Sequence, residues 1–286
     1  AMVAHHFTVD VEEYFHSSAL EQLIPATQWD GLTRRAPLLV RRLLDRMDTF
    51  GVRGTFFILG WLAGHEPDLV KEIAERGHEV ASHGWDHKRV THQSAEAFRD
   101  SVRRTKRFLE DLVGQEVLGF RAPSFSIVPG SEWALDVLLD EGYRYDSSLF
   151  PIKQHPTYGY PEGKRDPHWI TRPSGRIAEI PPATLRLAGS NLPAAGGAYF
   201  RLLPYALIRG GLRSAQDRGV PGTFFIHPWE LDQERPQDRV LPRLTQLRLF
   251  GGRQRAWSRL DRLFTEFRFG PIAGTLSSME SQALVG

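Results

Sequence analysis

Cysteine is absent from the 286 residues of this chain. The chain can therefore form no disulfide, offers no thiolate ligand to a metal ion and has no cysteine nucleophile. A cysteine-free composition suits the cytoplasm, although many exported proteins also lack cysteine. The chain is long enough to bury a sizeable apolar core, so it needs no disulfide or metal ion simply to fold.

An excess of charge and a long apolar run are missing as well. The 36 Lys and Arg residues nearly balance the 34 Asp and Glu residues. This balance gives no case for a nucleic-acid-binding protein. No apolar stretch approaches the ~18 residues of a membrane span. Arginines do gather between Arg243 and Arg262, and we interpret them as a solvated helix face rather than as a site for an anionic partner.

Short buried strands alternate with amphipathic helices over the first half of the chain. Strands are predicted at residues 7–11, 54–60, 78–82 and 117–120, and helices at 37–50, 67–76, 94–113 and 131–141. This alternation predicts an α/β fold with a parallel sheet, open or closed into a barrel. Catalytic residues should then lie at the carboxyl ends of the strands.

The pattern changes after Asp146. Residues 151–173 are rich in Pro, Gly, Tyr and His and predict a long functional loop. Beyond it we expect a strand at 177–180, a glycine-rich loop at 189–197, a helix at 200–218, a strand at 222–226 and a mainly helical segment at 242–267. The tail beyond Gly274 is expected to be loose. No linker divides the chain, which favours a single domain.

Two histidines four residues apart follow the predicted strand at 78–82. A helical turn between His83 and His87 would bring their imidazole nitrogens within ~2.1 Å of one metal ion. The motif lacks the glutamate of H-E-x-x-H, which disfavours a zincin protease. The alternative interpretation is two surface histidines placed by chance.

A pair of acids ends the first predicted strand. Asp10 and Glu12 lie on one face by the two-residue period of a strand, whereas Glu13 points to the other face. Two carboxylates buried side by side are costly unless a cation or hydrogen bonds compensate. A metal ion beside His83 and His87 would supply that compensation, and a solvated strand end is the alternative.

Two more polar residues end later strands. Arg121 follows the strand at 117–120, and its guanidinium would fork onto a carboxylate and keep it ionised. His227 follows the strand at 222–226, where an imidazole suits acid or base chemistry near pH 7. Each signal alone is weak, but polar residues at four predicted strand ends together indicate one site.

Taken together, these motifs resemble those of the polysaccharide deacetylases with a NodB homology domain, a group of carbohydrate esterases. The similar segments are Thr8–Phe15, His83–His87, Arg121–Pro123 and Phe225–His227. The sequence Asp-Val-Glu-Glu-Tyr-Phe-His, with Ala-Tyr-Phe-Arg-Leu-Leu-Pro-Tyr further on, is similar to the sequences of a subfamily found at exopolysaccharide and exosortase loci. The resemblance implies a distorted (β/α) barrel over residues 5–230, which includes the 151–173 loop, and a helical C-terminal extension over 231–286 packed on it.

The resemblance also implies a metal-dependent hydrolase of non-peptide carbon–nitrogen bonds, which removes N-acetyl groups from the amino sugars of a polysaccharide or oligosaccharide. Glu12, His83 and His87 would hold the ion, expected to be Zn²⁺ with Co²⁺, Mn²⁺ or Ni²⁺ as alternatives. The ion would lower the pKa of water toward ~7.

The remaining roles follow from the same resemblance. Asp10 would act as the base, Arg121 would orient it, and His227 would donate a proton to the leaving amine. A backbone N–H near Ser124 would stabilise the oxyanion. Trp85 and Trp229 are expected to lie beside the substrate.

The chain departs from the family's motifs at several positions. Val11 stands where the family has a second adjacent aspartate, so the ligand role passes to Glu12. Ser124 replaces the family's usual tyrosine. The fourth motif, Asp-Trp, has no clear match, and Asp146 is its nearest candidate.

Two other functions stay open at this point. A metal-dependent amidohydrolase acting on a small cyclic amide or ureide would need a small closed pocket, whereas an open groove would favour a glycan. A non-catalytic glycan-binding barrel is disfavoured by the complete set of polar residues. The expected partner is an acetylated amino-sugar glycan, not a nucleic acid or a membrane. We expect a cytoplasmic location in a bacterium, with export as the alternative if an N-terminal segment has been removed.

Overall fold

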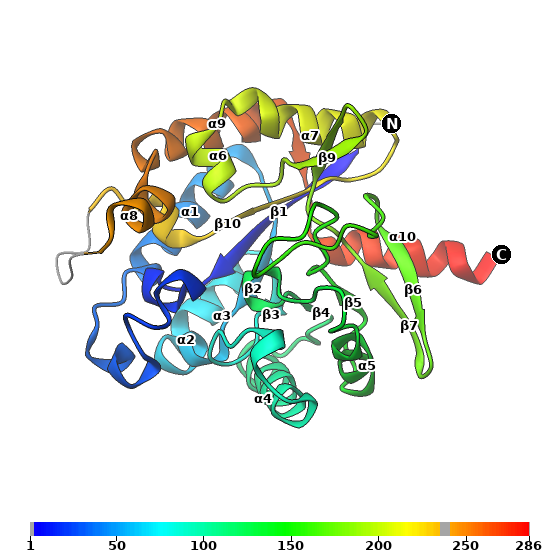
Figure 1. The fold of residues 1–286 in the computed structure, drawn as a ribbon, viewed down its shortest axis with the longest axis horizontal. Helices are drawn as coiled ribbons and strands as arrows, with labels where there is room; N and C mark the ends of the chain where they lie inside the picture. The colour runs from blue at the N-terminus through cyan, green and yellow to red at the C-terminus, as the bar shows by residue number, and fades with distance from the viewer. Residues whose placement is uncertain (1–2, 235–240, 286) are drawn as a thin grey trace.

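Strands and helices alternate along the chain as the sequence predicts, and the computed structural model describes residues 3–234 and 241–285 (Figure 1). The strands are β1 (Ala4–Val11), β2 (Thr55–Ile58), β3 (Glu79–Ser82), β4 (Gly119–Phe120), β5 (Tyr145–Asp146), β6 (His168–Arg172), β7 (Gly175–Glu179), β8 (Thr184–Leu187), β9 (Ser190–Pro193), β10 (Thr223–Ile226) and β11 (Arg268–Phe269). The helices are α1 (Ala36–Phe50), α2 (Gly60–His65), α3 (Pro67–Glu75), α4 (Ala95–Val113), α5 (Trp133–Asp140), α6 (Ala198–Leu202), α7 (Tyr205–Asp217), α8 (Arg243–Phe250), α9 (Ala256–Glu266) and α10 (Ile272–Val285).

The main sheet has the order β10-β1-β2-β3-β4-β5-β7-β6, and its neighbours are parallel except for the β6–β7 hairpin. The chain that leaves β7 crosses to the other end of the sheet. There Pro182 pairs with Thr223, and Gly196 pairs with Phe225. The ring is therefore closed by isolated bridges instead of a continuous ladder, which gives the distorted barrel that the sequence predicts.

Closure at Gly196 depends on the absence of a side chain. This residue has φ of 141°, and a Cβ placed on it would lie 1.8 Å from the carbonyl oxygen of Phe225. Both the backbone conformation and the close approach exclude any larger residue. Gly196 thus lets the segment after β9 lie directly against β10.

The two faces of β1 have different surroundings. Phe7 and Val9 belong to the large apolar cluster between the sheet and the surrounding helices. Thr8 and Asp10 point the other way, into the barrel, where both contact Arg121. The period of two that predicts this strand therefore separates the apolar core from a polar barrel interior.

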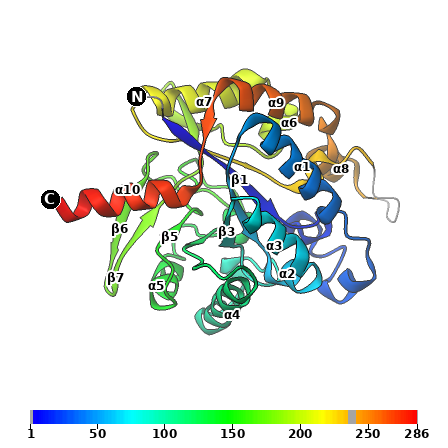
Figure 2. The same ribbon diagram turned by 180° about the vertical axis from the view of Figure 1, so that it is seen from behind.

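The C-terminal segment forms a helix, so the prediction of a loose tail beyond Gly274 is wrong. Ile272 and Leu276 of α10 are buried with Phe57, Tyr145 and other side chains of the barrel interior. The N–H of Ile272 donates to Thr55 Oγ1, and the N–H of Ala273 donates to Glu79 Oε1, each at 2.9 Å. Since Thr55 and Glu79 begin β2 and β3, α10 seals the amino ends of the strands, as Figure 2 shows from behind.

Other segments differ from prediction in detail. The helix expected at 200–218 is divided at Pro204 into α6 and α7, because proline lacks the N–H that a continuous helix needs. The expected loop at 189–197 contains β9, and the loop expected at 151–173 ends in β6. The segment after residue 231 is not purely helical, since β11 pairs with β1. Among the described residues, no helix has the length and apolarity needed to cross a membrane.

The packing of α10 against the barrel can be tested by its contribution to the free energy of unfolding. Leu276 is 1% exposed, and Leu276→Ala should lower the free energy of unfolding by about 3 kcal/mol through lost burial and a cavity. Leu284, on the same helix, is 88% exposed, so Leu284→Ala should change it by less than about 0.5 kcal/mol. Denaturant unfolding measures both values, and equal effects of the two variants would contradict the packing of α10.

Candidate active site

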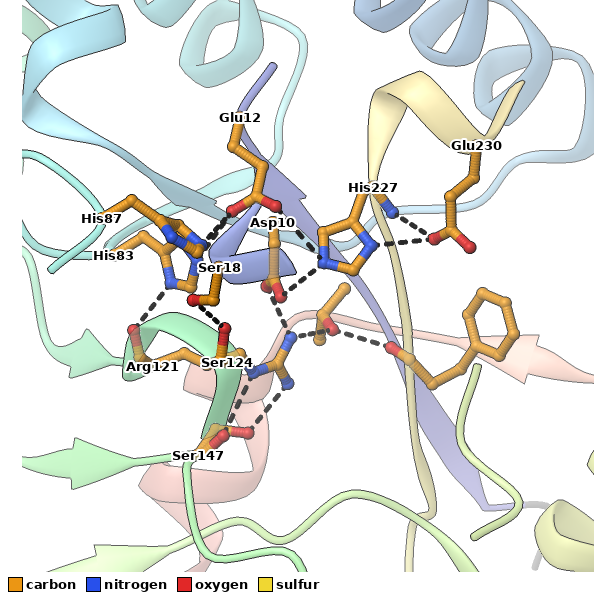
Figure 3. A network of polar contacts seen from close by, with 12 residues as sticks. Asp10, Glu12, Ser18, His83, His87, Arg121, Ser124, Ser147, His227 and Glu230 are labelled. Atoms are coloured by element: carbon orange, nitrogen blue, oxygen red, sulfur yellow. Dashed lines mark hydrogen bonds and ion pairs between the residues drawn. The ribbon is translucent and has the colours of Figure 1, made fainter. Parts of the chain in front are cut away.

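Polar side chains from several strand ends converge at one end of the barrel (Figure 3). Asp10 and Glu12 lie at the carboxyl end of β1, and each is 2% exposed. His83, Arg121 and His227 immediately follow β3, β4 and β10. The structure thus brings together the acids, the histidines and the arginine that the sequence singles out.

Glu12 and the two spaced histidines form a compact group of possible metal ligands. Glu12 Oε2 lies 2.7 Å from His87 Nε2 and 3.2 Å from His83 Nε2. One ligand atom from each of the three residues lies within 4.8 Å of the others. All three side chains are buried, so their polar atoms need a common partner.

The donor set of this group fits a divalent metal ion. His83 Nδ1 lies 2.7 Å from the carbonyl oxygen of Arg121, and an N–H donated there leaves the Nε2 lone pair facing Glu12. Two imidazoles and one carboxylate are ligands that Zn²⁺ accepts, and three protein ligands are typical of catalytic sites with an open position. Direct ligation by Glu12 therefore agrees with the geometry.

The backbone between the two histidines is not helical, contrary to the turn expected from their spacing. Gly84 has φ of 75° and His87 has φ of 56°, both in the left-handed region. The N–H of Gly84 donates to Ser82 Oγ, and the N–H of Trp85 donates to Ser101 Oγ of α4. The loop reaches the same juxtaposition of imidazoles by a different route.

Asp10 is held by the guanidinium of Arg121. Arg121 Nη1 donates to Asp10 Oδ1 at 2.9 Å and to Thr8 Oγ1 at 2.6 Å. Its other nitrogens donate to the carbonyl oxygen and the hydroxyl of Ser147. Arg121 is fully buried and stacks over the ring of Phe57. The predicted pairing is present, but through one carboxylate oxygen instead of both.

His227 faces both acids from the opposite side. Its Nε2 lies 3.7 Å from Asp10 Oδ2 and 3.6 Å from Glu12 Oε1. Burial alone would lower the pKa of His227, but the carboxylates of Glu12, Glu230 and Asp10 outweigh it and raise that pKa to about 9. Without a bound cation, the imidazole is therefore protonated at neutral pH.

Glu230 is a functional residue that the sequence analysis missed. Its Oε2 lies 2.9 Å from His227 Nδ1 and accepts the backbone N–H of His227 at the same distance. Its Oε1 accepts from Arg201 Nε at 2.6 Å, within a fully buried ion pair. Burial would raise the pKa of Glu230, but Arg201 and His227 lower it to about 2. The spacing His-Pro-Trp-Glu, which is a capping pattern around a short helix, was the only local signal.

The three residues that were predicted to lie beside the substrate differ in their positions relative to the candidate site. Trp229 is stacked on His227, with ring centroids 4.9 Å apart and planes at 17°. Ser124 lines the same cavity and pairs its hydroxyl with that of Ser18 at 2.6 Å. Trp85 packs under Arg104 and against Phe108 of α4 and is not among the residues that line this cavity, so its place beside the substrate stays a prediction.

Two other acids, Glu13 and Asp146, accept hydrogen bonds from groups outside the candidate site. Glu13 accepts the N–H of Ala36 at the start of α1. Burial raises the pKa of Glu13 to about 7, against the opposing effect of that hydrogen bond. Asp146 accepts from the N–H and the hydroxyl of Ser148 and pairs in register with Glu179. Asp146 therefore binds its own loop, whereas Glu230 is the acid that contacts His227 Nδ1.

A cavity of about 550 Å³ lies above these residues. Asp10, Glu12, His87 and His227 form its floor, and aromatic side chains form much of its wall, namely Phe125, Phe150, Tyr158, Tyr199, Phe225 and Trp229. It reaches solvent at exposed residues including Ala19, Pro156 and Arg248. The cavity is therefore open at the surface and not a closed small pocket.

Comparisons with protein families divide the chain in two. Residues 29–145 match the family described as polysaccharide deacetylase, and residues 147–277 match a domain of unknown function, DUF3473. Asp10 and Glu12 precede the first match, whereas His227, Glu230 and Arg201 lie in the second. The candidate site is therefore assembled across both regions.

Curated relatives match the first region. The peptidoglycan-N-acetylglucosamine deacetylase PgdA of Listeria monocytogenes is 30% identical over 121 residues, which cover 39% of this chain and 25% of that protein. A peptidoglycan-N-acetylglucosamine deacetylase of Bacillus cereus is 29% identical over 96 residues, which cover 33% of this chain and 35% of that protein. The chain thus spans a quarter to about a third of the length of these relatives.

Solved structures resemble the chain over its whole length. A Mycobacterium smegmatis protein, described only provisionally as a polysaccharide deacetylase, aligns with a TM-score of 0.64 and 21% identity over 99% of this chain and 96% of its own. A CE4 family pseudoenzyme of Bacillus anthracis aligns with a TM-score of 0.51 and 14% identity over 96% of this chain and 66% of its own. These likenesses show the fold, and the pseudoenzyme illustrates that the fold alone does not establish catalysis.

The metal site predicts a residue-specific loss of binding. His87→Ala should reduce Zn²⁺ affinity by on the order of 100-fold or more, because one of three protein ligands is removed. The matched control is His92→Ala, which alters an exposed histidine five residues away and should bind Zn²⁺ as the unaltered chain does. Calorimetric titration of metal-free protein measures both, and unchanged affinity in His87→Ala would exclude this ligand set.

The ion pair at His227 predicts a titration in the metal-free protein. The pKa of His227 should lie near 9 and should fall in Glu230→Gln, which removes one stabilising carboxylate. Because this pKa lies above the ordinary 6.5, the pairing stabilises the fold fully below pH 6.5 and is lost as pH rises through about 9. NMR of the histidine ring protons follows the titration, and a midpoint at or below 6.5 in the unaltered chain would contradict the pairing.

Proposed function

Because the chain carries a polysaccharide deacetylase domain joined to a DUF3473 region, we propose that it is a metal-dependent hydrolase that removes N-acetyl groups from the amino sugars of a glycan. One observation carries this proposal. A carboxylate anchored by a buried arginine and a histidine anchored by a buried glutamate face each other beside a Glu-His-His ligand set. That arrangement supplies a base, an acid and a place for a cation within one cavity.

The proposed cofactor is a divalent ion held by Glu12, His83 and His87. When bound, such an ion polarises a carbonyl group and lowers the pKa of water, which supplies a nucleophile at neutral pH. Zn²⁺ is our choice because the donors are nitrogen and oxygen atoms in a set of three. Co²⁺, Mn²⁺ and Ni²⁺ accept similar donors.

Asp10 is the proposed base. Its Oδ1 accepts a hydrogen bond from Arg121, which fixes the plane of the carboxylate. Its Oδ2 is the oxygen that faces His227 Nε2, and Asp10 lines the cavity. This oxygen is therefore the atom that would accept a proton from the attacking water.

His227 is the proposed acid. Glu230 accepts the hydrogen bond from Nδ1 of the imidazolium of His227. The second proton of the imidazolium therefore lies on Nε2, which faces the acids on the cavity floor. In the metal-free protein the nearby carboxylates raise the pKa of His227 to about 9, and the contact of Glu230 with Nδ1 favours the charged ring that a general acid needs to protonate a leaving amine. Trp229 covers one face of the imidazole and so holds the ring orientation.

A glycan fits the cavity better than a small cyclic amide does. The cavity reaches the surface, and the hydroxyls of Tyr158 and Tyr199 are paired at 2.9 Å on its wall. Aromatic walls with a few polar groups suit the apolar faces and hydroxyls of sugars. The names of the Listeria and Bacillus relatives support N-acetylglucosamine as the sugar. We propose an exopolysaccharide as the polymer, on the motif resemblance, and a cytoplasmic location stays a prediction.

The assignment of Asp10 as base is tested with a paired set of variants. Asp10→Asn should retain bound Zn²⁺ and lose on the order of 10³-fold in kcat, because no group remains to take the proton. His83→Ala should lose the metal itself. Release of acetate and of free amine from N-acetylated chito-oligosaccharides measures turnover.

The control for these variants is Asp86→Asn, which alters an exposed acid within the same histidine segment and should keep full activity. Full activity of Asp10→Asn would refute its role as base. Absence of acetate release by the zinc-loaded unaltered chain, with metal bound in full stoichiometry, would favour the non-catalytic glycan-binding barrel.

A further inference from the structure

A second cavity, of about 510 Å³, lies next to the active-site cavity along the chain. Residues His155–Tyr158 line the active-site cavity, and Pro161 together with residues Gly163–His168 lines the second one. We call the second cavity the basic pocket, after its charged residues Lys164, Arg165, Asp166, Arg186 and Arg218. One loop therefore contributes to both cavities.

The basic pocket has more positive than negative charge. Its four cationic side chains face one acid, Asp166, and that acid is paired with Arg218 at 2.9 Å. Within the part of the chain that the structure describes, neither Lys164 nor Arg186 lies within 4.0 Å of a carboxylate. Arg186 contacts the amide oxygen of Asn191 at a long 3.4 Å. These two cations are thus available to an external anion.

Arg165 is held in place at the base of this pocket. Its Nε donates to Thr184 Oγ1 at 2.8 Å, and its Nη2 donates to Thr184 O and to Ser214 Oγ. Burial lowers the pKa of Arg165, and the neighbouring Arg218 and Arg186 lower it further, against the opposing effect of Asp166. The hydrogen bonds of the guanidinium therefore go to neutral partners, and one acid stands against four cations in the pocket.

The chemistry of the pocket selects an oxyanion. Guanidinium groups match carboxylate and phosphate with paired N–H donors, and an ammonium adds a point charge. The pocket is also tied to the active-site wall, since Asn191 Nδ2 donates to the carbonyl oxygen of Pro151, next to Phe150. A polymer with one sugar in the active-site cavity would reach the pocket by passing over this shared loop.

We propose that the basic pocket binds a carboxylate or phosphate group of the same glycan whose amino sugar occupies the active-site cavity. The proposal rests on the proposed function and narrows its substrate class to acidic glycans. Neutral glycans would still enter the active-site cavity, but without the contacts from Lys164, Arg165 and Arg186.

The test compares acidic and neutral oligosaccharides of equal length. The probes are a hyaluronan octasaccharide, which alternates glucuronate with N-acetylglucosamine, and the neutral N-acetylchito-octaose. Binding to the zinc-loaded Asp10→Asn chain is measured by calorimetry at low salt. We expect about tenfold tighter binding of the acidic probe, and this preference should fade as salt rises because exposed charges are screened.

The decisive variant is Lys164→Glu with Arg186→Glu, which in the Asp10→Asn chain should abolish the preference while leaving N-acetylchito-octaose binding unchanged. In the chain that keeps Asp10, the same two substitutions should leave deacetylation of N-acetylchito-octaose unchanged. Its matched control is Lys71→Glu with Arg107→Glu, which makes the same change in net charge at exposed positions on α3 and α4. This control should keep the preference. Both double variants should retain the unfolding midpoint of the parent chain, which excludes misfolding as a cause.

Several outcomes would overturn the proposal. Equal loss in both double variants would indicate a nonspecific effect of net charge, and no loss in either would exclude the pocket. Binding of inorganic phosphate in the pocket without any preference between the oligosaccharides would assign it to free small anions. An acidic preference lost only in Lys164→Glu with Arg186→Glu, together with no deacetylation of either probe by the zinc-loaded chain that keeps Asp10, would support the pocket while contradicting the proposed function.

Discussion

The rest of the site depends on the burial of two carboxylates at the end of β1. Asp10 and Glu12 are nearly inaccessible, and a buried charge is tolerated only with a counter-charge and hydrogen bonds. Arg121 compensates Asp10, and the histidines, with the cation that they would bind, compensate Glu12. Arg121 is itself buried, so Thr8 and Ser147 must satisfy its remaining N–H groups. The polar interior of the barrel follows from this requirement.

The need of buried charges for counter-charges also explains why residues of the DUF3473 region lie in the candidate site. His227 lies close to both carboxylates and is drawn to its charged form. Glu230 then needs a cation of its own, which Arg201 supplies from α6 at full burial. A buried pair of this kind adds little stability in itself, because desolvation offsets much of the Coulomb attraction. Its value lies in the fixed direction of His227, and the DUF3473 region is therefore part of the candidate site and not an appendage.

The sequence predicts those parts of the site that local periodicity determines. The two-residue period of a strand places Asp10 and Glu12 on one face, and the predicted strand ends locate Arg121 and His227. Both predictions need only the residues that are close to these positions in the sequence. Arg201 and Glu230 are 29 residues apart, and only the packing of α6 against β10 brings them together. The contacts of Trp85 with α4 could not be predicted either, because the left-handed Gly84 turns the chain toward that helix. The helix at the C-terminus was missed since its stability comes from tertiary contacts, which propensity does not report.

The two ends of the barrel differ in structure. One end is covered by α10, and the polar side chains and the active-site cavity lie at the other. The N-terminal end of α10 covers the amino ends of β2 and β3 by donating to Thr55 and Glu79. The carboxyl ends stay open because the strands deliver charged groups that must face a polar medium or a cation. The loop before β6 follows the carboxyl end of β5. Its residues 147–152 are buried, whereas most of residues 153–167 are partly or fully exposed. Its first part therefore adds aromatic wall to the catalytic cavity, and its second part is free to present cations to whatever extends beyond it.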